Sequence, residues 1–228
     1  MILYYTHRRF GESRIIDNCF VRLAEQAERL GQQMVAVLPF QDYRSFKHSK
    51  NFRLFDPSGW LYKFIAYETI EEGIPDIYHR ILKGLEVAGE FETIYLAEHD
   101  VLYVDAHFKH VPKEGLGYNL NYTYLSEHGY FQRHSNCLAL SMLCGHADLI
   151  KKGVEGKLQE LKDNTFNCYE PQGAQIRSNF KTAEPCVDIR HDFNQSWRVN
   201  AKTDRFWDKI PKSDIWPSAG GLWAEINK

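Results

Sequence analysis

The segment from residue 2 to residue 38 consists of a strand, a helix and a second strand, and this order restricts the fold more than any other part of the sequence. Residues 2–5 are apolar and predict a buried strand, and apolar residues recur at helical spacing from Ile15 to Leu30. Gly31 is a natural helix C-cap, and the apolar run Met34–Leu38 ends at Pro39. Such a β-α-β unit places its two strands parallel in one sheet, with a right-handed crossover. The chain is therefore predicted to be α/β.

A further helix and strand repeat this pattern. Pro75 suits the first turn of a helix, whose apolar positions continue from Ile77 to Ala88 and lead into an apolar run before Glu98. Helical spacing also covers 138–152 and 154–162, and roughly the last forty residues indicate a packed, irregular tail. At 228 residues, an α/β chain is commonly one domain. We expect a single domain with a central, mostly parallel sheet flanked by helices.

Composition and absent motifs exclude several classes of protein. The formal charge of −2 provides no global cationic field for tight, sequence-independent nucleic-acid binding. The five cysteines form no CxxC pair, which argues against a disulfide framework and a zinc ribbon and favours a reduced, cytoplasmic protein. We find no signal peptide and no stretch of about 20 apolar residues, so a soluble protein without membrane partners is expected. P-loop, dinucleotide-binding and Gly-x-Ser-x-Gly motifs are missing, which argues against the corresponding NTPases, oxidoreductases and hydrolases.

Polar residues interrupt the apolar segment Thr93–Tyr103 at Glu98-His99-Asp100. In α/β folds, the carboxyl ends of strands are where ligands bind, although polar residues at a strand end often only face water. Alternation along a strand would direct Glu98 and Asp100 to one face and His99 to the other. Asp100 with Glu98 or Asp105 could hold a hard cation such as Mg²⁺ or Mn²⁺. A second apolar-flanked segment, residues 187–191, ends in His191, which could complete the site or serve as a hydrogen-bonded structural residue.

These segments also resemble a known family. The strand ending in Tyr5-Thr6, the helical segment Tyr78–Leu85 and the segment Tyr95–Tyr103 together resemble GT-A glycosyltransferases, and more narrowly the compact glycosyltransferase-like proteins of phages and bacteria. Residues 188–191, followed by Asn194 and Trp197, resemble the C-terminal motif of these enzymes. The resemblance spans residues 1–197, and Glu-His-Asp stands where the family has Asp-x-Asp.

The resemblance implies a GT-A domain over residues 1–228, with a nucleotide-sugar-binding half at 1–110 and an acceptor-side half with a C-terminal tail at 111–228. It implies an Mn²⁺ or Mg²⁺ ion bound by Asp100 and His191, with Glu98 in support. It also implies that Tyr5 and Thr6 lie against the nucleotide base. Arg80 and Lys83 would approach the diphosphate, or else only form an exposed helix face. Glu170 would be the catalytic base, with Glu127 and Asp148 as weaker candidates.

The implied activity is transfer of a sugar from a nucleotide diphosphate sugar, UDP-sugar favoured, to an acceptor hydroxyl. Residues 41–59 alternate basic and aromatic side chains, which is typical of a solvated surface loop but also suits a DNA strand. A hydroxymethylated pyrimidine in phage DNA, reached by base flipping, is therefore one predicted acceptor. A glycan or lipid-linked acceptor, a non-catalytic nucleotide- or glycan-binding module and, last, a metal-dependent nuclease are the alternatives. Sugar, stereochemistry and oligomeric state stay open.

Overall fold

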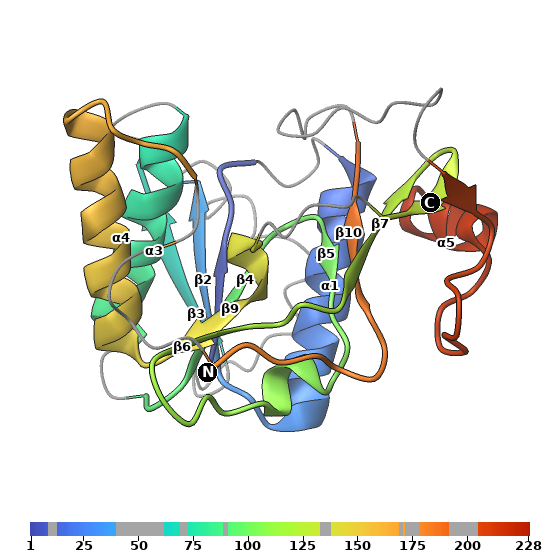
Figure 1. Cartoon of the computed structure of the whole chain (residues 1–228), viewed down its shortest axis with the longest axis horizontal. Coiled ribbons are helices and arrows are strands. Elements are labelled where there is room, and N and C mark those ends of the chain that lie inside the picture. Colours follow the sequence, from blue (N-terminus) through green and yellow to red (C-terminus); the bar gives the residue numbers. More distant parts are fainter. Residues whose placement is uncertain are drawn as a thin grey trace.

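A computed structural model describes residues 1–8, 13–39, 62–68, 73–88, 91–132, 138–168, 171, 178–191 and 205–228. Within these residues the strands form two sheets, one of six strands in the order β3-β2-β1-β4-β9-β6 and one of five in the order β11-β8-β7-β10-β5. Figure 1 shows the first sheet on the left, and strands β5, β10 and β7 of the second sheet on the right. The expected α/β fold, with a central sheet flanked by helices, is confirmed.

The first sheet is parallel over most of its width. Its strands are β1 (Ile2–Tyr5), β2 (Met34–Pro39), β3 (Tyr62–Tyr67), β4 (Ile94–Ala97), β6 (Leu116–Tyr118) and β9 (Leu143–Gly145). The strands β3, β2, β1 and β4 run parallel, whereas β9 is antiparallel to both β4 and β6. The carboxyl ends of the four parallel strands therefore lie along one edge of the sheet.

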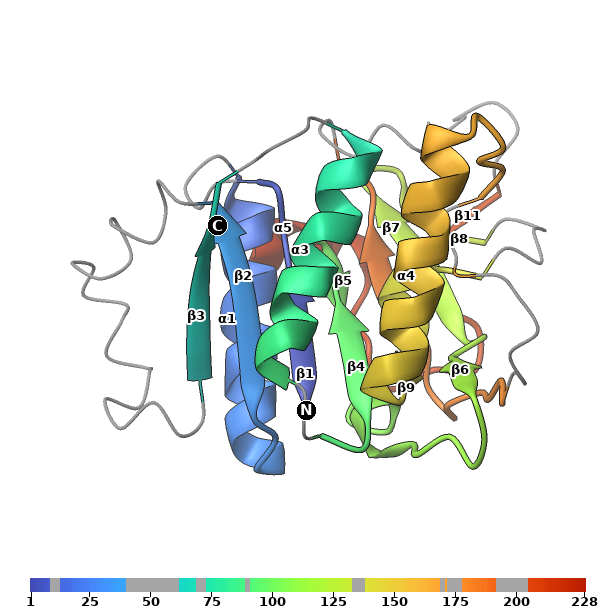
Figure 2. The ribbon, with the colours of Figure 1, turned by 90° about the vertical axis from the view of Figure 1, so that its left-hand side faces the viewer.

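Helices cover both faces of this sheet because β1 is apolar on both of its sides. Ile2 and Tyr4 pack in one core cluster with α1 (Arg14–Leu30), while Leu3 and Tyr5 pack in another with α3 (Ile74–Ala88) and α4 (Ala147–Lys162). Figure 2 shows α3 and α4 in front of the sheet and α1 behind it. Gly31, with φ of 64°, ends α1 as the sequence predicts.

The order of the strands creates a switch point between β1 and β4. From β1 the chain passes through α1 to β2 on one side, and from β3 it passes through α3 to β4 on the other side. Because α1 and α3 cover opposite faces, the two connections leave the sheet in opposite directions at this point. Open α/β sheets bind their ligands outside the carboxyl ends of the strands at such a switch point.

The second sheet continues the chain beyond β4. Its strands are β5 (Val101–Leu102), β7 (Tyr122–Ser126), β8 (Gly129–Phe131), β10 (Cys186–Ile189) and β11 (Phe206–Trp207), and it packs against the C-terminal helix α5 (Ala219–Ile226). Two short 3₁₀ helices lie at His107–Lys109 and Leu140–Met142. Ile15 and Cys19 of α1 join the core of this second sheet, so α1 connects the two sheets.

Two predicted elements differ from the structure. The helix expected from residue 138 is wrong at its start: residues 143–145 form β9, and a single helix, α4, then runs from Ala147 to Lys162. The C-terminal tail is not wholly irregular, because it contains α5, which Ser218 caps by accepting a hydrogen bond from the Gly221 amide.

Among the described residues, no helix is both long enough and apolar enough to cross a bilayer. The division of the chain near residue 110 stays a prediction.

Candidate functional site

The Glu98-His99-Asp100 segment is a turn that joins the two sheets. Strand β4 ends at Ala97 and β5 begins at Val101, so the three polar residues lie between strands rather than on one. Tyr4 of β1 is paired with Ala97, which brings the following residues Tyr5 and Thr6 beside this turn. The turn therefore lies at the switch point between β1 and β4.

Strand β10 brings His191 to the same place. It pairs antiparallel with β5, with Asp188 opposite Val101, and the Ile189 amide donates a hydrogen bond of 2.8 Å to the Asp100 carbonyl oxygen. The chain leaving β10 consequently passes alongside Asp100. This pairing explains how two residues 91 positions apart in sequence come together.

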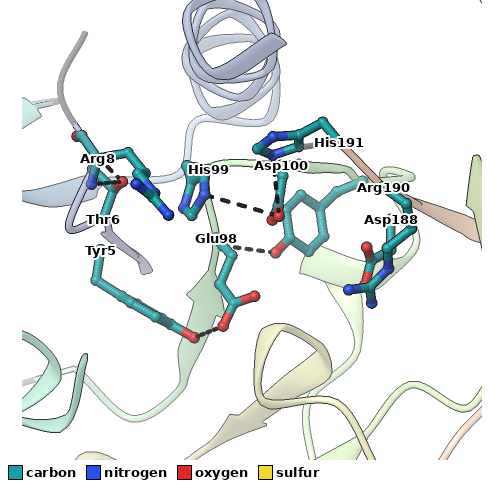
Figure 3. Close-up of polar contacts among 10 residues, drawn as sticks. Tyr5, Thr6, Arg8, Glu98, His99, Asp100, Asp188, Arg190 and His191 are labelled. Carbon is teal, nitrogen blue, oxygen red and sulfur yellow. Dashed lines mark hydrogen bonds and ion pairs between the residues drawn. The ribbon is translucent and has the colours of Figure 1, made fainter. Parts of the chain in front are cut away.

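His99, Asp100 and His191 form a compact group in which one ligand atom from each residue lies within 4.8 Å of the other two. The Asp100 Oδ2 atom is 3.7 Å from His191 Nε2 and 3.9 Å from His99 Nε2 (Figure 3). The side chains of His99, Asp100 and His191 are 11%, 4% and 5% exposed. A small, buried group of three metal-capable side chains is the strongest chemical feature among the described residues.

Electrostatics keep these groups in forms that can bind a cation. Burial lowers the pKa of His99, and the opposing attraction to Asp100 does not restore it. Burial raises the pKa of Asp100, but His99, His191 and Arg190 together outweigh it and hold that pKa below its ordinary value. At neutral pH, therefore, the carboxylate is ionised and the His99 imidazole is neutral, which are the protonation states required for coordination.

Glu98 lies apart from this group. Its Oε1 atom accepts a hydrogen bond of 2.6 Å from the Tyr5 hydroxyl, and its amide donates to the Tyr103 hydroxyl oxygen at 3.0 Å. Figure 3 shows the Glu98 side chain directed toward Tyr5. The expectation that Glu98 and Asp100 share a face while His99 points away is wrong, because the strand ends at Ala97 and its alternation does not reach the triplet.

Asp188 and Arg190 form a buried ion pair beside the group. Arg190 Nη2 donates to Asp188 Oδ2 at 2.8 Å, and both side chains are under 10% exposed. The guanidinium carbon of Arg190 also lies 4.4 Å from the centre of the Tyr124 ring. Its positive charge contributes to the lowered pKa of Asp100.

The structure places the other predicted ligand-binding residues as follows. Thr6 is buried, and its Oγ1 accepts a hydrogen bond from the Arg8 amide at 3.0 Å. Arg80 is only 1% exposed and donates to Asp76 Oδ2 at 2.7 Å, whereas Lys83 is 45% exposed and pairs with Glu86 at 2.5 Å. Contact of Arg80 and Lys83 with a diphosphate stays a prediction.

Among the described residues, the acidic candidates Asp105, Glu127 and Asp148 do not join the group. Asp105 is bound by Arg29 and by Gln26, at 2.8 Å and 2.7 Å to its Oδ1 atom. Glu127 and Asp148 are 70% and 88% exposed. Glu170, the predicted catalytic base, lies outside the described residues, as does the basic and aromatic stretch 41–59.

Two histidines near the turn were not predicted as site residues. His99 is one, and the other is His7, which follows β1 and meets the His99 ring edge to face at 5.5 Å between centroids. Burial lowers the pKa of His7 to about 4, with further lowering by His99 and Arg8. The prediction from sequence directs His99 away from Asp100 only because it extends the strand through the triplet. A strand that ends at Ala97 gives no such reason, and His99 is then a candidate ligand.

A separate groove of about 850 Å³ lies along α1. Its walls come from α1, from residues 101–106 and from the C-terminal region that includes Trp216. His99, Asp100 and His191 do not line this groove. The metal-capable side chains of the turn and this groove are therefore in different places.

No protein-family model and no curated protein matches the sequence. Solved structures overlap with the chain at low similarity. A protein described as a nucleotide-diphospho-sugar transferase, from Desulfovibrio desulfuricans G20, has 10% identity and a TM-score of 0.45 over 98% of this chain and 93% of its own. A nucleoside-diphosphate-sugar pyrophosphorylase from Vibrio cholerae RC9 has 10% identity and a TM-score of 0.39 over 84% and 93%. A glycosyltransferase involved in glycosylation of the major capsid of PBCV-1 has 14% identity and a TM-score of 0.40 over 82% and 91%. Overlap at this level does not establish a shared activity.

Proposed function

We propose that this chain is a metal-dependent glycosyltransferase that moves a sugar from a nucleotide diphosphate sugar to an acceptor hydroxyl. The observation that carries the proposal is the position of the group His99, Asp100 and His191, at the switch point of a largely parallel sheet. A site for a divalent cation in that position suits a ligand that carries phosphates.

The residues present fit such an ion. Two imidazoles and one carboxylate converge within 4.8 Å, and the carboxylate is held ionised. A cation bound there would stabilise the negative charge that develops on a diphosphate leaving group. Asp100 and the two histidines would hold the ion, and Arg190 adds a fixed positive charge beside it.

We assign the nucleotide of the sugar donor to the end of β1. Tyr5 and Thr6 lie beside the turn and are the residues we assign to the nucleotide base, with a uridine diphosphate sugar as the favoured donor. The Tyr5 hydroxyl donates to Glu98, and both Tyr5 and Thr6 are buried at this position, so contact with the base would require them to become exposed when the donor binds. Glu170 is the proposed catalytic base, because an inverting transfer requires a carboxylate to accept the proton of the acceptor hydroxyl.

For the acceptor, we propose a hydroxymethylated pyrimidine in DNA, supported by the basic and aromatic side chains of residues 41–59. A glycan or lipid-linked acceptor is the alternative within the same enzyme class. A module that binds a nucleotide or a glycan without catalysis is the alternative outside it, because the triplet departs from Asp-x-Asp.

The proposal is tested by sugar-nucleotide turnover. The purified chain is incubated with Mn²⁺ and a panel of nucleotide diphosphate sugars, and release of the nucleoside diphosphate is measured with hydroxymethylated DNA, unmodified DNA of the same sequence, or a glycan as acceptor. We expect turnover that requires the metal, that depends on the acceptor, and that falls at least about a hundredfold in Asp100→Asn, because this substitution removes the only carboxylate of the group.

Asp163→Asn is the matched control, since Asp163 is the C-cap of α4 and its side chain accepts a hydrogen bond from Gln159. This variant should keep full turnover. Turnover by Asp100→Asn equal to that of the wild type would refute the metal role. Nucleotide binding without turnover of any donor would favour the non-catalytic module.

A further inference from the structure

The group at the turn has a mixed set of donor atoms. Two of its members are imidazoles and only one is a carboxylate. Imidazole nitrogen suits transition metals such as Zn²⁺, Co²⁺ and Ni²⁺, whereas carboxylate, carbonyl and water oxygens suit Mg²⁺, Ca²⁺ and Mn²⁺. The composition of this group therefore bears on which ion it selects.

The other acids nearby are already engaged. Glu98 accepts a hydrogen bond from Tyr5, and Asp188 is paired with the buried guanidinium of Arg190. Neither carboxylate belongs to the compact group, and drawing either one toward Asp100 would disturb the hydrogen bond to Tyr5 or the buried pair with Arg190, which is costly. The oxygen-rich coordination that a hard cation requires is therefore not within easy reach.

Burial adds a second constraint. The side chains of the group are between 4% and 11% exposed, so few water molecules have access to an ion held among them. Mg²⁺ loses its hydration water reluctantly and usually keeps several water ligands in proteins. Ions that accept imidazole nitrogens in place of water ligands lose less binding free energy when they are dehydrated in such a site.

The ring contacts fix the imidazole of His99. His7 meets one side of it edge to face at 5.5 Å between centroids, and the His191 ring lies 6.2 Å away on the side of Asp100. The orientation that directs Nε2 of His99 toward Asp100 is thereby held by its neighbours (Figure 3).

From these observations we infer that His99 is a metal ligand and that the group selects an imidazole-preferring transition-metal ion, of the Co²⁺ or Zn²⁺ kind, over Mg²⁺. The inference rests on the proposed function only in that it concerns the same site. It departs from the expectation of an Mn²⁺ or Mg²⁺ site formed by Asp100, His191 and Glu98, because it replaces Glu98 by His99.

Isothermal titration calorimetry of the full chain without nucleotide tests the inference. Co²⁺, Zn²⁺, Mn²⁺ and Mg²⁺ are titrated separately, and the visible absorption of bound Co²⁺ is recorded as a report on nitrogen coordination. We expect Co²⁺ and Zn²⁺ to bind at one site at least about a hundredfold more tightly than Mg²⁺. In His99→Asn, Co²⁺ affinity should fall at least about tenfold and the Co²⁺ absorption should change, whereas weak Mg²⁺ binding should not.

Three variants make the result specific. Glu98→Gln should leave Co²⁺ affinity within about twofold, since Glu98 lies outside the group. His128→Asn changes a histidine that is 45% exposed and should have no effect. His191→Gln should act like His99→Asn, and circular dichroism shows whether each variant is folded. If His99→Asn misfolds, His99→Gln takes its place, and the absorption of Co²⁺ in that variant and in the wild type decides the question.

Mg²⁺ binding as tight as that of Co²⁺, or Co²⁺ binding unchanged in folded His99→Asn, would overturn the inference. These results differ from failure of the proposed function. Selective Co²⁺ binding in a chain that turns over no sugar nucleotide would uphold the inference and refute the transferase. Turnover supported equally by Mg²⁺ and Co²⁺, together with weaker metal binding in Glu98→Gln, would uphold the transferase and refute the inference.

Discussion

At the scale of single residues, the contact between Tyr5 and Glu98 separates two carboxylates that are adjacent in sequence. Asp100 faces the histidines, whereas Glu98 accepts the Tyr5 hydroxyl hydrogen at 2.6 Å. A hydrogen bond to a carboxylate stabilises more than one to a neutral carbonyl. The Tyr5 hydroxyl should therefore contribute measurably to the free energy of unfolding.

We expect Tyr5→Phe to lower that free energy by about 1.5 to 3 kcal/mol, because the variant leaves the Glu98 carboxylate without this donor. Tyr130→Phe is the matched control: its hydroxyl donates to the neutral Pro217 carbonyl at 3.0 Å, and its loss should cost only about 0.5 to 1.5 kcal/mol. Urea unfolding of the two variants measures both values. Equal costs would show that Glu98 does not carry the proposed charge-assisted bond.

The sequence predicted part of this residue-level picture. The sequence predicts that Asp100 and His191 act together, and the antiparallel register of β5 and β10 places their side chains 3.7 Å apart, while their binding of a metal ion stays a prediction. The orientation of His99 could not be predicted by strand alternation, because alternation holds only within a strand and β4 ends one residue before Glu98. The sequence also does not predict the buried ion pair between Arg80 and Asp76, although the two residues are four positions apart on the same helix.

At the scale of elements, the close approach of α3 to β1 positions the edge of the sheet where the turn lies. Gly84 of α3 sits directly on Leu3: a Cβ atom at Gly84 would come within 2.1 Å of Leu3 Cδ1. Leu3 is fully buried, so its side chain has little room to move. The absence of a side chain at position 84 therefore sets the spacing between helix and sheet.

Gly84→Ala should reduce the free energy of unfolding by about 1 to 2 kcal/mol, because overpacking outweighs the gain in helix propensity. Gly156→Ala is the matched control on α4, where nothing lies within 4 Å of the added Cβ atom. That variant should be more stable than the wild type by up to about 1 kcal/mol. Chemical denaturation of both variants provides the comparison, and a stabilised Gly84→Ala would contradict the packing argument.

The sequence predicts the elements that have a clear apolar run or period. These are α1 to within one residue, β1, β2 and most of α3. The sequence predicts neither β3, although that strand is as long as β2, nor the three-residue β9, whose neighbours in sequence have helical spacing. The place of β9 between β4 and β6 depends on partners elsewhere in the chain, which local periodicity cannot reveal.

At the scale of the whole molecule, buried histidines link stability to pH. His107 is completely buried against Tyr103 and Phe180, and burial, with a smaller contribution from His110, lowers its pKa to about 3. In the unfolded chain this pKa returns to about 6.5. Between these two values the unfolded state binds more protons than the folded state, so stability rises with pH across this window and is lost as pH falls.

His107→Gln should flatten the dependence of unfolding free energy on pH between pH 4 and 6, by up to about 1.4 kcal/mol per pH unit. His128→Gln, at a histidine 45% exposed, should leave the slope unchanged. Urea unfolding at several pH values measures the slope independently of any constant loss of packing in the core. An identical slope in His107→Gln and the wild type would show that His107 can be protonated in the folded state.

The pairing of β5 with β10 also determines when the site can first exist. Asp100 and His191 are adjacent in space only because two strands far apart along the chain lie in antiparallel register. On a ribosome, the first sheet's four parallel strands are complete once residue 97 has been made, but the third member of the group arrives only with residue 191. The growing chain thus passes through a long period in which the four parallel strands have been made but the group His99, Asp100 and His191 is incomplete, so any ion that needs all three side chains can bind only after residue 191 has been added.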